Sequence, residues 1–363
     1  MRGKAEHRPP YSRRDSPFSW TEAVPVNSGP LRIGVIGCAD IARRRTLPAL
    51  AAHPGVRLAA IASRDPAKAR RFADLFGGDP VTGYAALLER DDVDAVYVPL
   101  PAALHAAWVE RALRSGRHVL AEKPLTTSAA DTEALVALAA SRGLALLENF
   151  MFLCHSQHAR VRALVADGAI GEVRGLTAEF AFPPVPADST LYRPDLGGGV
   201  LTDAGVYPLR TALLHLGPGL EVRGAHLRID EEHGVDVSGS ALLAAPGGAT
   251  AHLTWGADRA YRSRYALWGS TGRIELPWAF TPPATHRAVV RVERRDRVEE
   301  LTLPAEDHFA GAVAAFVARV RDGAPSVLEG AALVEQARLV DRVRRAAPAA
   351  PAAPTTAGSP GTR

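Results

Sequence analysis

The sequence predicts an α/β protein. Its first half forms a parallel sheet with helices on both faces, and its second half forms an α+β domain with an open, mostly antiparallel sheet. Up to about residue 150, runs that are apolar throughout alternate with helical patterns, which is typical of a buried parallel sheet. Beyond about residue 155 this alternation stops, and strand-like stretches follow one another, many with period-two alternation. The length of 363 residues suits two domains of ordinary size.

The first half begins after a polar, Pro/Ser/Arg-rich segment, residues 1–30, which we expect to be disordered. Residues 31–153 then form the first predicted domain, and Asp65 is the expected N-cap of its second helix. Its apolar runs predict strands at 31–37, 56–63, 94–100, 118–122 and 144–150, with helices at 40–52, 65–76, 103–115 and 128–141.

The second half, residues 154–345, forms the second predicted domain, for substrate binding and oligomerisation, and a loose Pro/Ala-rich tail follows at 346–363. An exposed sheet face there favours a homo-oligomer, either a dimer or a tetramer. Strands are predicted at 172–182, 221–229, 236–244, 249–256, 262–269, 287–293 and 297–303, and helices at 156–167, 200–216, 308–321 and 330–345.

Composition excludes several classes of protein. No apolar run approaches the roughly 20 residues that a membrane helix needs, and the charged N-terminus lacks the apolar stretch of a secretory signal. Two cysteines, Cys38 and Cys154, form no disulfide framework, so we expect a reducing compartment and a cytoplasmic location. The net charge is +4 without a Lys/Arg block in the body, which argues against nucleic acid as a partner. His155 and His158 lack further ligands at suitable spacing, so we expect no metal.

The first strand leads directly into a glycine-containing loop, Gly37-Cys38-Ala39-Asp40-Ile41-Ala42. Its pattern approximates G-x-G-x-x-G/A, in which small residues let the backbone approach a pyrophosphate at the start of a helix. Ala39 replaces the second glycine but is still small. Because the loop follows a strand, opens a helix and begins an alternating α/β half, it predicts a dinucleotide-binding domain of the Rossmann type.

The end of the second strand indicates which dinucleotide binds. An acidic residue there would bind the ribose 2′-hydroxyl of NAD, but this chain has Ser63 and Arg64. A hydroxyl and a guanidinium suit a 2′-phosphate, while Asp65 is better placed as a helix cap. The sequence therefore favours NADP over NAD.

A lysine stands out at the end of the strand at 118–122. Only three of the 43 basic residues are lysines, namely Lys4, Lys68 and Lys123, so a retained lysine suggests a site that needs a compact amine. Lys123 follows a buried strand whose carboxyl end faces the ligand crevice of a parallel sheet. The preceding Glu122 either pairs with Lys123 or holds the loop.

The stretch Leu196–Pro208 contains a triple glycine before a helix, so its backbone can approach a ligand. Asp203 and Tyr207 are four residues apart and share a face of that helix. Reduction of a ketone needs a hydride and a proton. Tyr207 is a usable acid if an ammonium such as Lys123 stabilises its phenolate, although a packed aromatic residue is the simpler alternative for this tyrosine.

Together, GVIGCADIA, the triplet Glu122-Lys123-Pro124 and GGGVLTDAGVYP resemble the glucose–fructose oxidoreductase/inositol dehydrogenase superfamily. ENFMF (148–152), YALWGSTG (265–272) and residues 280–283 look like its branch of NDP-hexose C-3 ketoreductases. The resemblance implies a Rossmann domain, an antiparallel-sheet domain and an active site between them, in which Lys123 and Tyr207 flank the substrate ketone. It also implies that Pro99 and Leu100 contact the cofactor and that His105 lies near the nicotinamide, although His105 could equally be a surface residue at a helix N-terminus. Ala102 and Ala103 stand where many relatives have Asn.

Candidate substrate contacts are less clear from the sequence. Asn149, one of two asparagines, and His158 follow the last strand of the first half at the domain junction, so we expect both near the substrate, together with Asp203. The remaining candidates for a nucleotide-sugar are the arginines and aromatic residues of the second half, where solvation and core packing are the alternatives: Arg193, Arg259, Arg262, Arg264, Tyr192, Trp255 and Tyr261.

Three functions follow as hypotheses. The first is NADPH-dependent reduction of the C-3 ketone of a dTDP-linked keto- or diketo-deoxyhexose, as in deoxysugar biosynthesis. The second is oxidation of an inositol or a free sugar by another type of superfamily dehydrogenase. The third is a non-catalytic NADP-binding regulator, which would not need Lys123 and Tyr207 together.

Overall fold

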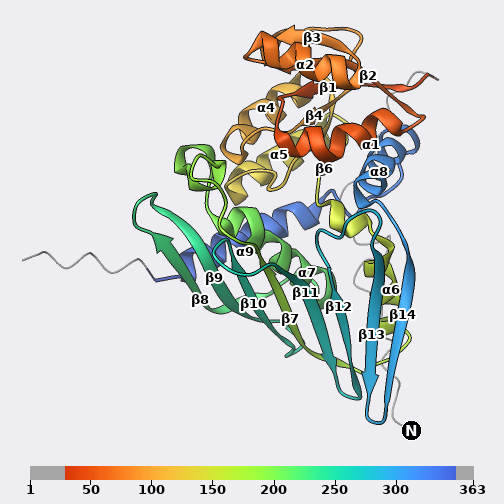
Figure 1. Ribbon diagram of the computed structural model, residues 1–363, viewed down its shortest axis with the longest axis vertical. Helices are drawn as coiled ribbons and strands as arrows, with labels where there is room; N and C mark the ends of the chain where they lie inside the picture. The colour runs from red at the N-terminus through yellow and green to blue at the C-terminus, as the bar shows by residue number, and fades with distance from the viewer. Residues whose placement is uncertain (1–28, 349–363) are drawn as a thin grey trace, which may run out of the picture.

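The computed structural model describes residues 29–348 and contains two sheets, one in each half of the chain (Figure 1). Most of the predicted disordered segment and most of the predicted tail therefore lie outside the described residues. The first sheet has six parallel strands in the order β3-β2-β1-β4-β5-β6. The second has eight strands in the order β14-β13-β12-β11-β7-β10-β9-β8. Both predicted sheet types are confirmed.

The first sheet has the alternating connections that the sequence predicts. Its strands are β1 (Leu31–Ile36), β2 (Val56–Ser63), β3 (Asp79–Thr82), β4 (Ala95–Val98), β5 (His118–Ala121) and β6 (Leu146–Glu148), and its helices are α1 (Leu47–Ala52), α2 (Pro66–Phe76), α3 (Tyr84–Leu88), α4 (Ala102–Arg114) and α5 (Ala129–Ser141). The sequence-based prediction missed β3 and α3. β3 is a four-residue edge strand with a proline and little buried apolar surface, so it lacks the periodicity on which prediction depends.

Two helices open irregularly. The helix predicted at 40–52 begins as a π-helical turn, η1 (Ala42–Thr46), before α1. The helix predicted at 200–216 likewise begins with the π-helical turn η5 (Leu201–Gly205) before α7 (Val206–Leu216). Both turns lie beside the cavity described below, and π-helical turns occur often at functional sites.

The second sheet is antiparallel except where β7 and β10 pair in parallel. Its strands are β7 (Val173–Ala181), β8 (Glu221–Asp230), β9 (Val235–Ala244), β10 (Thr250–Gly256), β11 (Arg262–Gly269), β12 (Gly272–Pro277), β13 (Arg287–Arg294) and β14 (Arg297–Ala305), of which the sequence-based prediction missed β12. α6 (Ser156–Ala166) packs against β13, and α7 packs against β7 and β10. The opposite face of the sheet exposes Leu242, Trp268 and Val298.

The last two helices link the halves of the molecule. α8 (His308–Asp322) packs against α1, and α9 (Ala331–Ala346) packs against α5 as well as β8. Arg321 donates to the backbone oxygen atoms of Gly29 and Gly55, and Arg338 pairs with Glu133 at 2.7 Å. These helices, which the prediction places with the second sheet, therefore cover the first half too (Figure 1). No helix within residues 29–348 is long and apolar enough to cross a membrane.

Candidate active site

A cavity of about 500 Å³ lies where the carboxyl ends of β1, β4 and β5 face the second sheet. Strand ends at this edge of a parallel sheet are the usual ligand-binding position. Its walls combine both halves of the chain. Among the predicted site residues, those that line the cavity are Ala39, Ile41, Pro99, Leu100, Glu122, Lys123, Asp203 and Tyr207.

The loop after β1 has the geometry that a phosphate requires. Gly37 has a φ of +113°, and a Cβ there would lie 2.7 Å from Cδ2 of Leu100, so a side chain does not fit. Its N–H donates to Ala62 O at 3.0 Å, whereas the N–H groups of Cys38 and Ala39 have no acceptor within residues 29–348. Free backbone N–H groups at a helix start are suited to an anion.

The end of β2 lies beside this loop. Ser63 is buried, and its Oγ accepts from the N–H of Asp65 at 3.1 Å, while Arg64 is exposed. Asp65 caps α2 by accepting from the N–H groups of Ala67 and Lys68, which confirms its expected role. An exposed guanidinium next to the phosphate loop, with no acid in its place, fits a 2′-phosphate.

Lys123 and Tyr207 are brought together in the cavity wall. The Nζ of Lys123 lies 5.3 Å from the ring centroid of Tyr207 and donates to both Oδ1 (2.7 Å) and the backbone oxygen (2.8 Å) of Asp203. Burial lowers the pKa of Lys123, but the charge and hydrogen bond of Asp203, together with the electrostatic effects of Tyr207 and Glu122, outweigh it, so the net pKa is raised. The lysine is therefore an ammonium held by Asp203, and Glu122 does not form the ion pair considered above.

Tyr207 is 4 % exposed and sits among the rings of Phe150, Phe152, Phe180 and Phe280. Within residues 29–348 its hydroxyl contacts only a weak acceptor, Sδ of Met151 at 3.8 Å. Burial raises the pKa of Tyr207, and the nearby Lys123 opposes this rise. The phenol is thus protonated near neutral pH, and its proton is not committed to a strong acceptor.

Two hydrogen bonds from residues that do not line the cavity hold the side chain of Glu122 in place. Its Oε1 accepts from the hydroxyl of Tyr97 and from Nδ2 of Asn149, each at 2.7 Å. The residues after Lys123 are fixed in a similar way, because Oε1 of the buried Glu148 accepts from the N–H of Leu125 at 2.7 Å. Burial raises the pKa of Glu148 to about 7.

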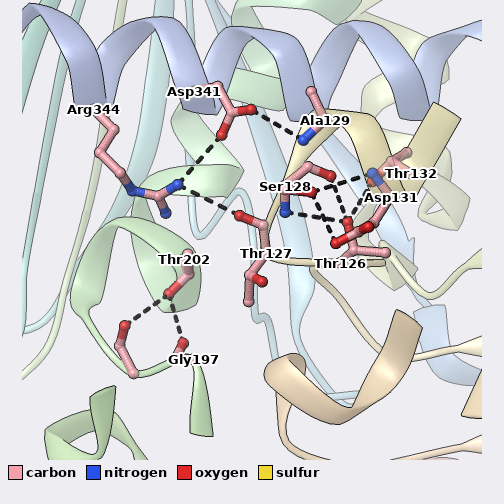
Figure 2. Close-up of polar contacts among 11 residues, drawn as sticks. Thr126, Thr127, Ser128, Ala129, Asp131, Thr132, Gly197, Thr202, Asp341 and Arg344 are labelled. Atoms are coloured by element: carbon pink, nitrogen blue, oxygen red, sulfur yellow. Dashed lines mark hydrogen bonds and ion pairs between the residues drawn. The ribbon is translucent and has the colours of Figure 1, made fainter. Parts of the chain in front are cut away.

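Helix α9 holds the next segment, residues 126–132, in place through hydrogen bonds (Figure 2). Oδ2 of Asp341 accepts from the N–H of Ala129 at 3.0 Å, and Arg344 donates to the backbone oxygen of Thr127. Within the segment, the hydroxyl groups of Thr126 and Thr132 lie 2.7 Å apart. The loop that carries Lys123 is thereby anchored to the C-terminal helix.

The triple glycine forms a tight turn against the cavity. The hydroxyl of Thr202 donates to the backbone oxygen atoms of Gly197 (Figure 2) and Gly199. A Cβ on Gly198 would lie 2.4 Å from the backbone oxygen of Leu191, so the turn excludes any side chain there. The close packing brings the backbone itself to the cavity surface and starts the helix that carries Asp203 and Tyr207.

Eight predicted site residues do not line the cavity: five belong to the phosphate loop and the end of β2 (Gly37, Cys38, Asp40, Ser63 and Arg64), and the other three are His105, Asn149 and His158. His105 is 1 % exposed, and its ring nitrogens contact the backbone oxygen atoms of Pro124 and Leu100 at 2.8 and 2.7 Å, so it joins two cavity segments instead of facing the nicotinamide. Asn149 is buried, and its Nδ2 donates to Oε1 of Glu122. His158 is buried between Ala279 O and the hydroxyl of Tyr265. Nδ2 of Asn149 and both ring nitrogens of His158 contact internal groups, which favours a supporting role over the expected substrate contacts, although Oδ1 of Asn149 has no partner within residues 29–348.

Most of the aromatic and arginine candidates for substrate binding also have other roles in the structure. Trp255 is fully buried, so packing accounts for it, and the ring of Tyr192 packs against that of His233 with a centroid distance of 4.7 Å. The four arginines all pair with nearby acids instead of pointing into the cavity: Arg193 with Asp195, Arg259 with Asp258, Arg262 with Glu179 and Arg264 with Glu179 and Glu275. The exposed Asp40 binds Arg43 and Arg44.

Sequence reasoning missed cavity residues from elements distant in the chain. Arg45 comes from η1, His308 and Phe309 from α8, and Phe180 from β7. The Arg-Arg-Arg run directly after the phosphate loop was a usable signal for Arg45. No comparable signal marks His308, because its place depends on how α8 folds back. No cluster of three or more potential metal ligands lies within residues 29–348.

Comparison with known proteins identifies relatives over nearly the whole described chain. A model of an oxidoreductase family with an NAD-binding Rossmann fold matches residues 31–150, and a GFO/IDH/MocA C-terminal domain model matches residues 158–275. A dTDP-3,4-didehydro-2,6-dideoxy-alpha-D-glucose 3-reductase from Actinomadura kijaniata is 53% identical over 89% of this chain and 97% of its own. One of the same name from Streptomyces violaceoruber is 56% identical over 87% and 95%.

A solved structure with the same fold is a 3-ketoreductase from Actinomadura kijaniata in complex with NADP and TDP-benzene. It matches with a TM-score of 0.85 and 53% identity, covering 88% of this chain and 98% of its own. An aldose–aldose oxidoreductase from Caulobacter crescentus matches with a TM-score of 0.80 at 26% identity.

Proposed function

The chain belongs to the GFO/IDH/MocA oxidoreductase family, and from that premise we propose that it reduces the C-3 ketone of a dTDP-linked 3,4-diketo-2,6-dideoxyhexose with NADPH. The observation that carries the proposal is the pairing of Lys123 and Tyr207 in a cavity that also opens onto the phosphate loop. Relatives above 50% identity are 3-reductases of such a sugar, which favours reduction over the oxidation of an inositol or a free sugar. A purely regulatory role would leave the Lys–Tyr pair without a purpose.

The residues present fit NADP. The N–H groups of Cys38 and Ala39 are free for the pyrophosphate, and the left-handed backbone of Gly37 leaves room for it. Arg64, beside Ser63, would hold the 2′-phosphate. Ile41, Pro99 and Leu100 are the apolar surface on which the nicotinamide half would rest. NADPH bound in this way supplies the hydride.

Lys123 and Tyr207 would act on the carbonyl oxygen. The ammonium of Lys123 donates to that oxygen and stabilises the negative charge that develops on it. The protonated phenol of Tyr207 delivers the proton, and the same ammonium stabilises the phenolate that remains. Asp203 positions Lys123 through its two contacts, and the aromatic rings around Tyr207 exclude water from the reacting atoms.

A turnover assay tests this function. The diketo sugar is generated in situ by a 2,3-dehydratase, and the loss of NADPH absorbance is followed with and without the sugar. We expect Tyr207→Phe and Lys123→Ala each to lower kcat by about 100- to 10,000-fold, the usual range for loss of proton transfer. Tyr84→Phe, at a packed tyrosine on α3, is the matched control and should leave kcat unchanged. Absence of sugar-dependent NADPH loss, or undiminished turnover by both site variants, would contradict the proposal.

Domain limits, assembly and location are part of the same proposal. We place the cofactor domain at 31–153 and the substrate domain at 154–345. The exposed Leu242, Trp268 and Val298 on the open sheet face support assembly into a dimer or tetramer. Two cysteines without a disulfide, Cys38 and Cys154, support a reducing, cytoplasmic location.

A further inference from the structure

A smaller cavity, of about 20 Å³, lies between helix α9 and the segment that follows Lys123. We call it the α9 cavity, and neither Lys123 nor Tyr207 lines it. Its volume suits one water molecule. None of the lining residues is basic, and they are residues 124–128, Thr132, Glu148, Thr202 and Val206, with Leu333, Gln336, Ala337, Val340 and Asp341 from α9.

On one side, the α9 cavity meets the side chain that supports the loop of Lys123. Oε1 of Glu148, at the end of β6, accepts from the N–H of Leu125, two residues after Lys123. Oε2 of the same carboxyl group is buried and has no partner within residues 29–348. Burial raises the pKa of Glu148 against the opposing charges of Arg210 and Lys123. Because buried polar atoms are normally paired and Glu148 lines the α9 cavity, a partner for Oε2 belongs there.

On the other side, the cavity meets a side chain that supports the helix of Tyr207. Nε2 of Gln336, on α9, donates at 2.9 Å to the backbone oxygen of Val206, which directly precedes Tyr207 in α7. Oε1 of Gln336 is also buried and has no partner in the described part of the chain. Two buried acceptors, one from each support, therefore share the wall of one water-sized cavity.

The buried hydroxyl groups of the wall are committed elsewhere. Thr126 donates to the backbone oxygen of Ser128 at 2.6 Å, so the hydroxyl of Thr132 is the donor to Thr126, 2.7 Å away (Figure 2). Thr202 donates to the backbone oxygen of Gly199 at 2.9 Å. A buried acceptor without a donor is costly, and a water molecule supplies two donors. An occupant of the cavity is thus the source of the missing donors.

We propose that one water molecule in the α9 cavity bridges Oε2 of Glu148 and Oε1 of Gln336, and that these two side chains are positioning residues for Lys123 and Tyr207. The inference rests on the proposed function, because it concerns how the two reacting groups of that reaction are held. Glu148 fixes the loop of Lys123, Gln336 fixes the start of α7, and the shared water makes the two positions depend on each other. A displacement of about 1 Å between reacting groups can cost about 100-fold in rate.

Variants of similar size test the positioning role in the turnover assay. Glu148→Met loses the acceptor for Leu125 and should lower kcat by about 10- to 100-fold, with KM for NADPH and for the sugar changed by less than about twofold. Glu148→Gln keeps an acceptor and brings an amide donor to the cavity, so kcat should stay within about threefold of wild type. Glu335→Met, on α9 but outside the cavity, is the control and should leave kcat unchanged. A loss in Glu148→Gln as large as in Glu148→Met would show that charge matters instead of position and would overturn the proposal.

A double-mutant cycle tests whether the two side chains share one water molecule. Gln336→Met removes the donor to Val206 and should lower kcat by about 3- to 10-fold. If one water serves both side chains, the double variant should lose less than the product of the two single losses, by about threefold or more. Melting temperatures confirm that each variant is folded. Single losses that simply multiply would overturn the shared water.

A crystal structure of the wild type tests the water directly and needs no variant. We expect one density peak in the α9 cavity within about 3.2 Å of both Oε2 of Glu148 and Oε1 of Gln336. An empty cavity, or a direct contact in which the carboxyl proton itself bridges the two oxygens, would overturn the inference even if turnover is normal. A bridging peak in a wild type that does not consume NADPH with the sugar would instead contradict the proposed function.

Discussion

The variant Asp203→Asn tests how the ion pair between Asp203 and Lys123 affects the protonation of Lys123. In the structure, Oδ1 of Asp203 lies 2.7 Å from Nζ of Lys123 and opposes the effect of burial on the pKa of that lysine. Asparagine keeps the size and the hydrogen bond but removes the charge. Because Asp203 also contributes to raising the pKa of Tyr207, both groups should lose their protons at lower pH in the variant.

The exposure of the two side chains determines how far the pKa of Lys123 should fall. The side chain of Asp203 is 48 % exposed and that of Lys123 is 15 % exposed, so solvent screens part of the attraction. For a close ion pair the interaction ranges from about 1 kcal/mol in water to about 4 kcal/mol in a partly buried setting. An intermediate value of about 2 kcal/mol corresponds to a fall of roughly 1.5 units in the pKa of Lys123.

The assay is the pH profile of kcat/KM. A lower pKa means that the ammonium of Lys123 is lost earlier as pH rises, so the alkaline limb should move down by about one to two pH units. Asp195→Asn removes another carboxylate that binds a basic side chain, but at the surface, and should leave the profile unchanged. An alkaline limb that stays in place or moves to higher pH in Asp203→Asn would refute the argument.

Three further predictions concern stability. Gly198→Ala should lower the free energy of unfolding by about 1–3 kcal/mol, because its Cβ would lie 2.4 Å from a backbone oxygen, and the melting temperature measures this. Tyr97→Phe removes a buried donor to Glu122 and should destabilise by about 1–3 kcal/mol in urea unfolding. Burial lowers the pKa values of His215 and His308 to about 3 and 4, so the unfolded chain takes up protons below pH 6.5 and the native chain does not. Stability should therefore fall from pH 6.5 toward 5, by up to about 2 kcal/mol per histidine at pH 5.

Each of the three stability predictions has a control variant. Gly247→Ala places a Cβ in open space and should leave the melting temperature unchanged. Tyr84→Phe serves the same purpose for Tyr97→Phe. For the pH series, His308→Phe should show a shallower loss of stability below pH 6.5 than wild type. A steeper or equal dependence would contradict the histidine explanation.

Much of the fold and part of the site could be predicted from sequence because local signals carry them. The phosphate loop, the cap at Asp65 and the alternation of apolar runs depend on residues that are neighbours in the chain. Lys123 and Tyr207 could be predicted because the end of a strand and one face of a helix can be recognised from a short stretch of sequence. β3 was missed because it has four residues, one of them a proline, and no buried side chain. β12 was missed because it has only two buried apolar residues, Ile274 and Leu276, which are too few to show a clear period in the sequence.

Residue chemistry and spacing were thus enough to indicate a dinucleotide loop, a lysine and a tyrosine, and a change of sheet type near residue 155. The tertiary structure alone decided which groups meet. It paired Lys123 with Asp203, turned Asn149 toward Glu122, and folded α8 back so that His308 lines the cavity. The physical reason is that hydrogen bonds, burial and charge act between groups near in space, whereas sequence periodicity reports only neighbours along the chain.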